Sequence, residues 1–205
     1  MLQGHRHKEP REALPIQETR RALQSFSEPA HDRNDDLRAV GVYRSDMTAF
    51  HVKGIYYELT LYMDLWNNEI VSHSLSSKRG DRMTYISGLE SLLELKKAYP
   101  QLSMVLHSDQ GSVYASKCFN DLLPMYNIVH SMSRAGTPTD NAAMEAINGW
   151  IKAELFMDFH VTGNENVKEE VDNYIVFFNE QRPAYSLNYL TPRQYRECFA
   201  PDYHC

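Results

Sequence analysis

The sequence lacks long apolar stretches. Its longest uninterrupted apolar run is the five residues from Tyr174 to Phe178, in a chain of 205 residues. A helix that crosses a bilayer needs about 20 apolar residues, so this run excludes a transmembrane helix. The opening residues, Met1-Leu2-Gln3-Gly4-His5, also lack the apolar centre of a signal peptide. We therefore expect a cytoplasmic protein with no membrane partner.

Cysteine is scarce as well. The chain has three cysteines, Cys118, Cys198 and Cys205, which is an odd number without paired spacing. Such a set does not predict a disulfide framework or a cysteine metal site. A reducing compartment fits it best, which agrees with the expected cytoplasmic location.

Basic residues are not in excess, although an excess is typical of proteins that bind nucleic acids. The chain has 21 Lys and Arg against 27 Asp and Glu, which gives a net charge of −6. Residues 1–38 contain seven residues of each sign, so the whole deficit falls on the remainder. If the chain binds DNA, it must use a local patch, bound metal ions or another segment.

Composition divides the chain into three parts. Residues 1–38 are polar, contain three prolines and show little apolar periodicity, which is typical of a mobile arm or a linker remnant. Regular apolar periodicity over residues 39–180 predicts one folded core. Residues 181–205 are expected to form a C-terminal tail of loop and short helix.

The core pattern predicts a mixed sheet flanked by helices. Strands are expected at Val40–Phe50, Ile55–Leu65, Glu69–Ser76, Ser103–Ser108 and Ile128–Met132. The short turn at Gly54 favours an antiparallel hairpin, whereas the later alternation of helix and strand favours parallel pairing. Helices are expected at Asp81–Ala98, Ser116–Leu123, Asp140–Met157 and Glu165–Phe178, the first with an apolar stripe of Met83, Ile86, Leu89 and Leu93. The prediction is an α/β domain with three antiparallel and then two parallel strands.

Two carboxylates have positions that suggest chemistry. Asp109 follows a short apolar strand and precedes Gly111, which permits a sharp turn. Glu145 lies inside a helical pattern, with 35 residues between it and Asp109. An acid at a strand end and an acid on a helix can hold a metal ion between two elements. Asp46, on the first strand, is the candidate for a third ligand, and Asp64, on the second strand, is its rival.

Three converging carboxylates repel one another unless a cation lies among them. Ligands that are all oxygen suit Mg²⁺ or Mn²⁺, which keep open positions for water and phosphate. Two such ions about 4 Å apart can activate an attacking oxygen and stabilise a leaving oxygen. Phosphodiester chemistry needs little more than this positioning and charge neutralisation. The pattern therefore predicts metal-dependent phosphoryl transfer.

The segments around these carboxylates resemble one known family. They are Ser45-Asp46-Met47-Thr48, His107-Ser108-Asp109-Gln110-Gly111-Ser112-Val113-Tyr114 and Gly136-Thr137-Pro138-Thr139-Asp140-Asn141-Ala142-Ala143-Met144-Glu145. The tail resembles the same family at Phe178-Asn179-Glu180-Gln181-Arg182-Pro183 and Leu190-Thr191-Pro192. Over about residues 40 to 197, the chain resembles the integrase catalytic core of bacterial insertion-sequence transposases of the OrfB type. That group belongs to the DDE superfamily, which also contains the retroviral integrases.

The resemblance implies a fold, an activity and partners. The fold would be ribonuclease H-like, and Asp46, Asp109 and Glu145 would be both the catalytic DDE triad and the metal ligands. The activity would be cleavage and transfer of DNA strands with two Mg²⁺ or Mn²⁺ ions, in which a 3′-hydroxyl at the element's end attacks a target phosphodiester. The expected partners are element-end and target DNA, further copies of the chain on that DNA, and an upstream helix-turn-helix protein or fused frame.

Three more residues are candidates for contacts with DNA. Lys152 lies seven residues after Glu145, two turns along the same helical face, and Asn141 lies four residues before Glu145. Arg134 lies in a loop with Gly and Pro and could contact a phosphate. His107, close to Asp109, is expected to pack or hydrogen-bond locally and not to bind metal.

Two other functions stay open. One is a ribonuclease H-like nuclease that cuts DNA without joining it. The other is an inactive, truncated core that only binds DNA or a partner. The intact set of three acids argues against decay, whereas the lack of a helical DNA-binding segment ahead of the core leaves truncation open.

Overall fold

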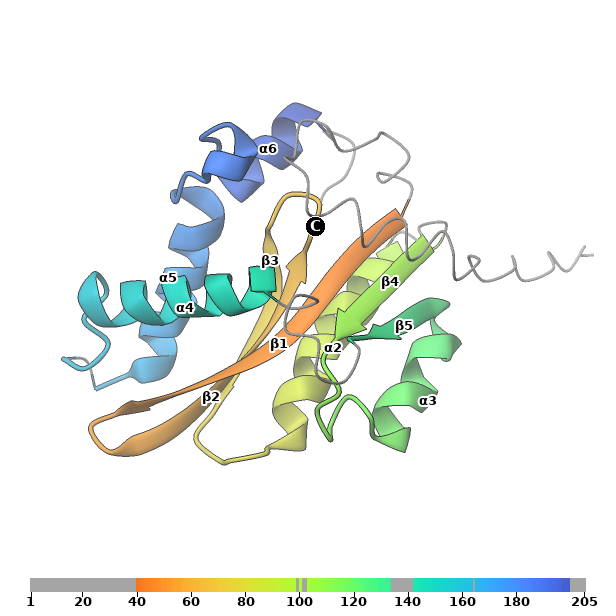
Figure 1. Cartoon of the computed structure of the whole chain (residues 1–205), viewed down its shortest axis with the longest axis horizontal. Helices are drawn as coiled ribbons and strands as arrows, with labels where there is room; N and C mark the ends of the chain where they lie inside the picture. The colour runs from red at the N-terminus through yellow and green to blue at the C-terminus, as the bar shows by residue number, and fades with distance from the viewer. Residues whose placement is uncertain (1–39, 99, 101–102, 134–141, 164, 200–205) are drawn as a thin grey trace, which may run out of the picture.

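The centre of the molecule is a mixed five-stranded sheet with the order β3-β2-β1-β4-β5 (Figure 1). The computed structural model describes residues 40–98, 100, 103–133, 142–163 and 165–199. Its strands are β1 (Val40–Val52), β2 (Ile55–Asp64), β3 (Ile70–Ser76), β4 (Ser103–Ser108) and β5 (Ile128–Met132). The first three pair antiparallel, and β4 and β5 continue the sheet in parallel from β1. The predicted sheet is confirmed.

A two-residue turn joins β1 to β2. Lys53 and Gly54 both have positive φ angles, of 50° and 79°, as tight hairpins with a right-handed twist require. Pairing continues through His51 to Val52, which lies opposite Ile55. β1 is therefore two residues longer than the predicted strand, and the hairpin extends to its turn.

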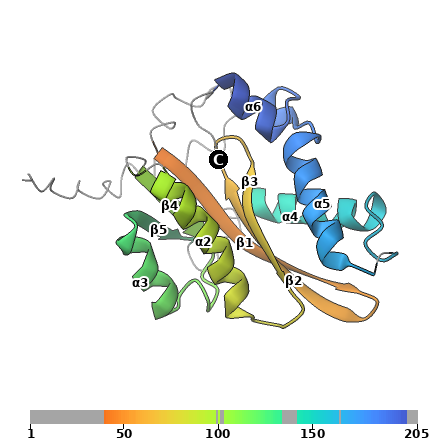
Figure 2. The same cartoon turned by 180° about the vertical axis from the view of Figure 1, so that it is seen from behind.

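Helices cover both faces of the sheet (Figures 1 and 2). On one face, α4 (Ala142–Met157) and α5 (Val167–Glu180) pack on apolar side chains of β1, β2 and β3. On the other, α2 (Arg82–Ala98) and α3 (Lys117–Met125) cover Tyr43, Tyr62 and Leu106. No helix in the described part of the chain is long and apolar enough to cross a membrane. Because both faces are covered, β1 and β2 are buried on both sides over much of their length, whereas Ala49, His51 and Ile55 near the hairpin turn are exposed.

The buried stripe of α2 differs from the predicted one. Met83 is 62% exposed, and the buried residues of α2 are Thr84, Tyr85, Gly88, Leu89, Leu92, Leu93 and Lys96. Gly88 explains the difference, since a Cβ atom there would lie 2.4 Å from Cε2 of Tyr62. The helix approaches the sheet at a residue without a side chain, which a count of apolar residues does not detect.

Local capping sets several helix boundaries. The Ser116 side chain accepts a hydrogen bond from the Phe119 amide, so α3 begins after Ser116. α3 runs to Met125 and includes Pro124, where the sequence predicted an end near Leu123. The Asn166 side chain accepts from the Glu169 amide and starts α5 two residues later than predicted.

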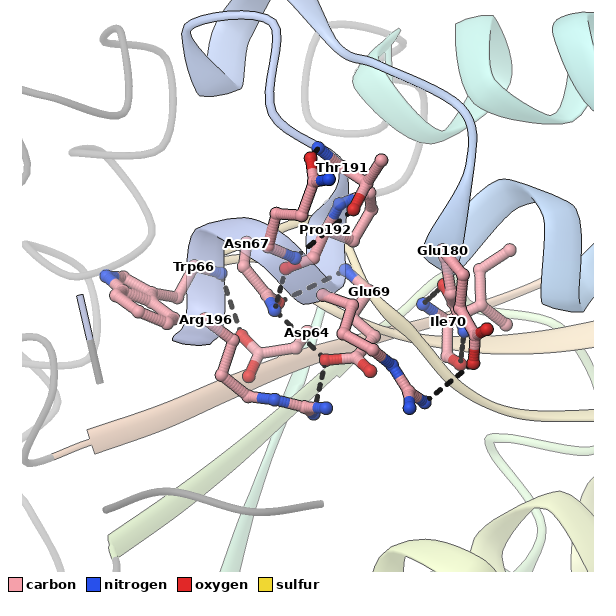
Figure 3. A network of polar contacts seen from close by, with 12 residues as sticks. Asp64, Trp66, Asn67, Glu69, Ile70, Glu180, Thr191, Pro192 and Arg196 are labelled. Atoms are coloured by element: carbon pink, nitrogen blue, oxygen red, sulfur yellow. Dashed lines mark hydrogen bonds and ion pairs between the residues drawn. The ribbon is translucent and has the colours of Figure 1, made fainter. Parts of the chain in front are cut away.

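The C-terminal residues pack against the turn between β2 and β3 (Figure 3). They form η4 (Tyr185–Leu187) and α6 (Pro192–Phe199). Arg196 of α6 forms an ion pair with Glu69, and the two side chains are only 7% and 5% exposed. Asn67 donates hydrogen bonds to Glu69 and to the Pro192 carbonyl. These contacts join the tail to the sheet, while the predicted boundary at residue 180 stays a prediction.

We predict that Arg196→Met lowers the free energy of unfolding by about 3–5 kcal/mol, because it leaves the Glu69 carboxylate buried without its cation. Arg193→Met is the matched control on the same helix. Its partner Glu180 is 40% exposed, and such pairs contribute about 0–1 kcal/mol. Urea unfolding of both variants measures the difference. Equal losses would contradict the assignment, and a separate transition for the tail would support the boundary at 180.

Candidate active site

Asp46 and Asp109 occupy matching positions on neighbouring parallel strands. Arg44 of β1 pairs with His107 of β4, and each acid lies two residues further along its chain. Adjacent strands lie about 4.8 Å apart, so the backbones of the two acids come together where β4 ends. The structure therefore brings together two of the three predicted ligands.

Backbone amides orient both carboxylates. Asp46 is 8% exposed, and its Oδ1 accepts a hydrogen bond of 2.8 Å from the Met47 amide. Asp109 lies just beyond β4, and its Oδ1 accepts a 2.8 Å hydrogen bond from the Gly111 amide. A Cβ atom on Gly111 would lie 2.8 Å from that oxygen, so glycine leaves the space that the Asp109 carboxylate occupies.

Asn148 connects α4 to Asp46. Its Nδ2 donates a 3.1 Å hydrogen bond to Oδ2 of Asp46, and the Asn148 side chain is buried. Glu145 lies three residues earlier on α4 and so shares this helical face. The contact brings the face that carries Glu145 toward Asp46. The Glu145 side chain itself lies outside the described residues, as do Asn141 and Arg134.

Asn148 was not among the predicted site residues. The feature that could have revealed it is its position, because this polar residue shares a helical face with Ile151 and Leu155, which are both fully buried. A buried asparagine needs polar partners, and a position one turn after Glu145 points to that carboxylate's neighbourhood. Lys152, a further turn along, is half-buried and forms no ion pair with a carboxylate of the described residues.

Asp64, the rival to Asp46, lies elsewhere on the sheet. It pairs with Tyr43, whereas Asp46 pairs with Leu61, so the two acids are three positions apart along β1. That separation corresponds to about 10 Å. The Oδ1 of Asp64 accepts a hydrogen bond from the Trp66 amide and stabilises the turn after β2 (Figure 3).

Buried tyrosines form the other side of the site. Ser45 of β1 and Tyr114 share a hydrogen bond of 2.6 Å, and the Tyr114 ring contacts Tyr85 edge to face. Burial, followed by the negative charges of Glu58, Asp109 and Asp46, raises the pKa of Tyr85 to about 12. Burial also raises the pKa of Tyr114 well above its usual value. A tyrosine with its usual pKa of about 10 is already neutral near pH 7, and these upward shifts keep both phenols neutral at higher pH as well.

His107 has the local role that the sequence predicted. Its Nδ1 lies 3.2 Å from the Ser131 hydroxyl, and its Nε2 lies 3.0 Å from the Ser133 hydroxyl. Both ring nitrogens are thus used between β4 and the end of β5.

A second histidine, His130, connects β5 to the residue before Asp109. The Asn120 Nδ2 donates to the carbonyls of Tyr114 and Ser116, so its Oδ1 accepts from Nδ1 of His130 at 2.8 Å. Nε2 of His130 lies 2.9 Å from the Ser108 hydroxyl, which itself donates to the Asp109 carbonyl at 3.0 Å. Burial lowers the pKa of His130, which favours the neutral ring.

We predict that neutral His130 makes stability depend on pH. Its pKa is lowered in the folded state, so the unfolded chain takes up the proton first as pH falls below about 6.5. The stabilisation is present above that pH and is lost as pH falls through the folded-state pKa. The free energy of unfolding of wild type should therefore fall more steeply between pH 7.5 and 5 than that of His130→Gln. His160→Asn, at an exposed histidine, should keep the wild-type slope, and equal slopes in all three proteins would refute the prediction.

The donors fit a hard divalent cation. Asp46 and Asp109 supply carboxylate oxygens, and the buried Oδ1 of Asn148 has no hydrogen-bond partner among the described residues. Those residues contain no group of three or more His, Cys, Asp or Glu that could hold a metal, and the third predicted ligand, Glu145, lies outside them. Oxygen donors of this kind suit Mg²⁺ or Mn²⁺.

The sheet order and the helices on both faces define a ribonuclease H-like fold. The HTLV-2 integrase catalytic core, solved in complex with magnesium, matches 75% of this chain and 94% of its own, with 19% identity and a TM-score of 0.58. The BIV integrase core matches 80% of this chain and 99% of its own, with 16% identity and a TM-score of 0.57.

Sequence comparison defines the family. One integrase core domain model matches residues 36–138, which is half of the chain, and a second of the same description matches residues 126–192. The chain therefore belongs to the integrase core domain family.

The relatives include proteins of bacterial insertion sequences. The putative transposase InsK of element IS150 from Escherichia coli K12 is 36% identical over 154 residues, 74% of this chain and 53% of that protein. The transposase of element IS904 from Lactococcus lactis is 31% identical over 157 residues, 76% of this chain and 61% of that protein. The chain thus spans between half and two thirds of the length of these two relatives.

Proposed function

We propose that this chain is the catalytic core of an insertion-sequence transposase, which cleaves DNA strands and joins them to a target. The observation that carries the proposal is the pairing of β1 with β4, which sets Asp46 beside Asp109. The Asn148 contact, which turns the Glu145 face of α4 toward Asp46, supports it further. The similarity to transposases of IS150 and IS904 favours strand transfer over simple cleavage.

Asp46, Asp109 and Glu145 would hold Mg²⁺ or Mn²⁺, with two ions in the active complex. Bound there, the metal supplies charge neutralisation for the phosphodiester and activation of the attacking oxygen. The magnesium in the HTLV-2 integrase core supports this choice of ion. The chain's own residues fix the ligands: Asn148 and the Met47 amide orient Asp46, and the Gly111 amide orients Asp109.

DNA is the proposed substrate, as element ends and as target. Lys152 would contact a phosphate near the site, since it shares the α4 face with Glu145 and has no carboxylate partner among the described residues. Arg134 and Asn141 remain proposed DNA contacts from the sequence. Assembly of several copies on DNA and a helix-turn-helix partner or fused frame belong to the same proposal.

We predict that Asp46→Asn, Asp109→Asn and Glu145→Gln each lower strand transfer by roughly 10³-fold or more, because groups that act as a unit fail together. Asp64→Asn is the matched control and should retain most activity. Labelled duplexes from the DNA that flanks the coding region, assayed with Mg²⁺, Mn²⁺ or chelator, measure cleavage and joining separately. Cleavage without joining would support the nuclease alternative. No activity in the wild type would support the inactive core, and full activity in chelator would refute the metal mechanism.

We predict that Mn²⁺ stabilises the wild-type fold, by about 2.7 kcal/mol when free metal is 100 times its dissociation constant. Asp109→Asn removes one repelling charge, so without metal it should be at least as stable as wild type, and with metal it should gain little. Thermal unfolding of both proteins, with and without Mn²⁺, measures this independently of activity. Asp121→Asn, at an exposed acid of α3, should respond like wild type. Equal metal-induced shifts in all three proteins would mean that the cation binds elsewhere.

A further inference from the structure

Cations without carboxylate partners are concentrated in one short segment. Among the described residues, many cations pair with acids, namely Lys97, Lys117, Lys168, Arg182, Arg193 and Arg196. Lys78, Arg79 and Arg82 form no such pair there, although all three are exposed. They lie within five residues, in the turn between β3 and α2 and at the first residue of α2. We call residues 76–82 the basic turn.

Two acids hold the basic turn through hydrogen bonds and form no ion pair with its cations, although their charges offset part of its positive charge. The buried Glu58 carboxylate accepts hydrogen bonds from the Gly80 amide at both oxygens, at 2.9 and 2.8 Å. The Ser76 hydroxyl donates to Asp81 at 2.7 Å, and the other Asp81 oxygen accepts from the Met83 amide. Those hydrogen bonds, together with the charge of Lys78, lower the pKa of Asp81. The turn is thus held in place by groups that bind its backbone and the Ser76 hydroxyl.

An aromatic ring restrains one of the cations. The guanidinium of Arg79 lies 4.9 Å from the ring centre of Tyr56 on β2. The Tyr56 hydroxyl donates to Glu58 at 2.6 Å, so the ring is tied to the same buried acid that holds Gly80. Arg79 is therefore partly ordered before any ligand binds, which lowers the entropy cost of binding.

The basic turn lies next to the proposed site. Tyr85 is one helical turn beyond Arg82, and the charges of Asp109 and Asp46 act on its phenol. In Figures 1 and 2, the connection from β3 to α2 lies at the same end of the molecule as the segment that follows β4. Lys152 belongs to α4 on the opposite face of the sheet. Unpaired cations therefore occur on the α2 side and on the α4 side of the two acids.

We infer that the basic turn binds the phosphate backbone of DNA and guides a strand to the site from the α2 side. The inference rests on the proposed function and adds a surface to it. Charge complementarity selects the ligand, because three exposed and unpaired cations beside a phosphoryl-transfer site match a chain of phosphates. Contacts of this kind fix the position of DNA without reading its sequence.

The test is DNA binding in chelator, where no catalysis occurs. The probe is a labelled duplex of arbitrary sequence, titrated by fluorescence anisotropy at several salt concentrations between about 50 and 200 mM. The test variant carries Lys78→Gln, Arg79→Gln and Arg82→Gln. The matched control carries Lys117→Gln, Lys168→Gln and Arg193→Gln, which remove the same charge from exposed cations that are paired with acids.

The basic-turn variant should bind more weakly at every salt concentration, and its slope of log K against log salt should be smaller by about three. The control should keep a slope close to that of wild type, and both variants should keep the wild-type melting temperature. Equal slopes in the two variants, or no binding by wild type, would overturn the inference, and a protein partner would then be the better occupant. Asp109→Asn, which lacks one carboxylate that repels phosphate, should bind DNA in chelator at least as tightly as wild type while losing strand transfer, so a failure here is distinguishable from a failure of the catalytic proposal.

Discussion

The parallel pairing of β1 with β4 is the constraint on which the rest of the site depends. It matches Arg44 with His107, so the two acids that follow come to one edge although 62 residues separate them. A shift of one residue would turn one carboxylate to the opposite face. The chain reaches β4 from β3 through α2, and α2 packs closely on the sheet where Gly88 leaves room for the Tyr62 ring.

Amide groups orient the two acids. Asp46 accepts hydrogen bonds from the Met47 amide and the Asn148 side chain, and Asp109 accepts one from the Gly111 amide. An amide donor orients a carboxylate and occupies only part of its lone-pair capacity. The two carboxylates are thus oriented as oxygen ligands of the kind that Mg²⁺ or Mn²⁺ accepts.

The sequence predicts what is local and misses what depends on distant contacts. β4 and β5 were predicted with their observed bounds, because short apolar runs end there at polar and turn residues. The exposed Met83 was wrongly placed in the core, since nothing near it in sequence reports the Tyr62 ring behind Gly88. Asn148 was missed because its partner lies 102 residues away. Asp46 and Asp109 were proposed as metal ligands from the motifs around them, and the pairing of β1 with β4 brings those two motifs close together.

Net charge is a poor guide to what this surface binds, because some basic residues form ion pairs with acids and others do not. In the described part of the chain, the acids on helices neutralise lysines and arginines on those helices, as Asp121 does for Lys117 and Asp172 for Lys168. Beside the basic turn, Glu58 and Asp81 bind backbone amides and hydroxyls and form no ion pair with its three cations, which outnumber these two acids. Salt screens electrostatic interactions between exposed charges over about 10 Å at moderate ionic strength. A ligand at the basic turn therefore interacts more strongly with those cations than with the distant acids. A chain with a net charge of −6 can therefore present a locally positive surface beside its own carboxylates.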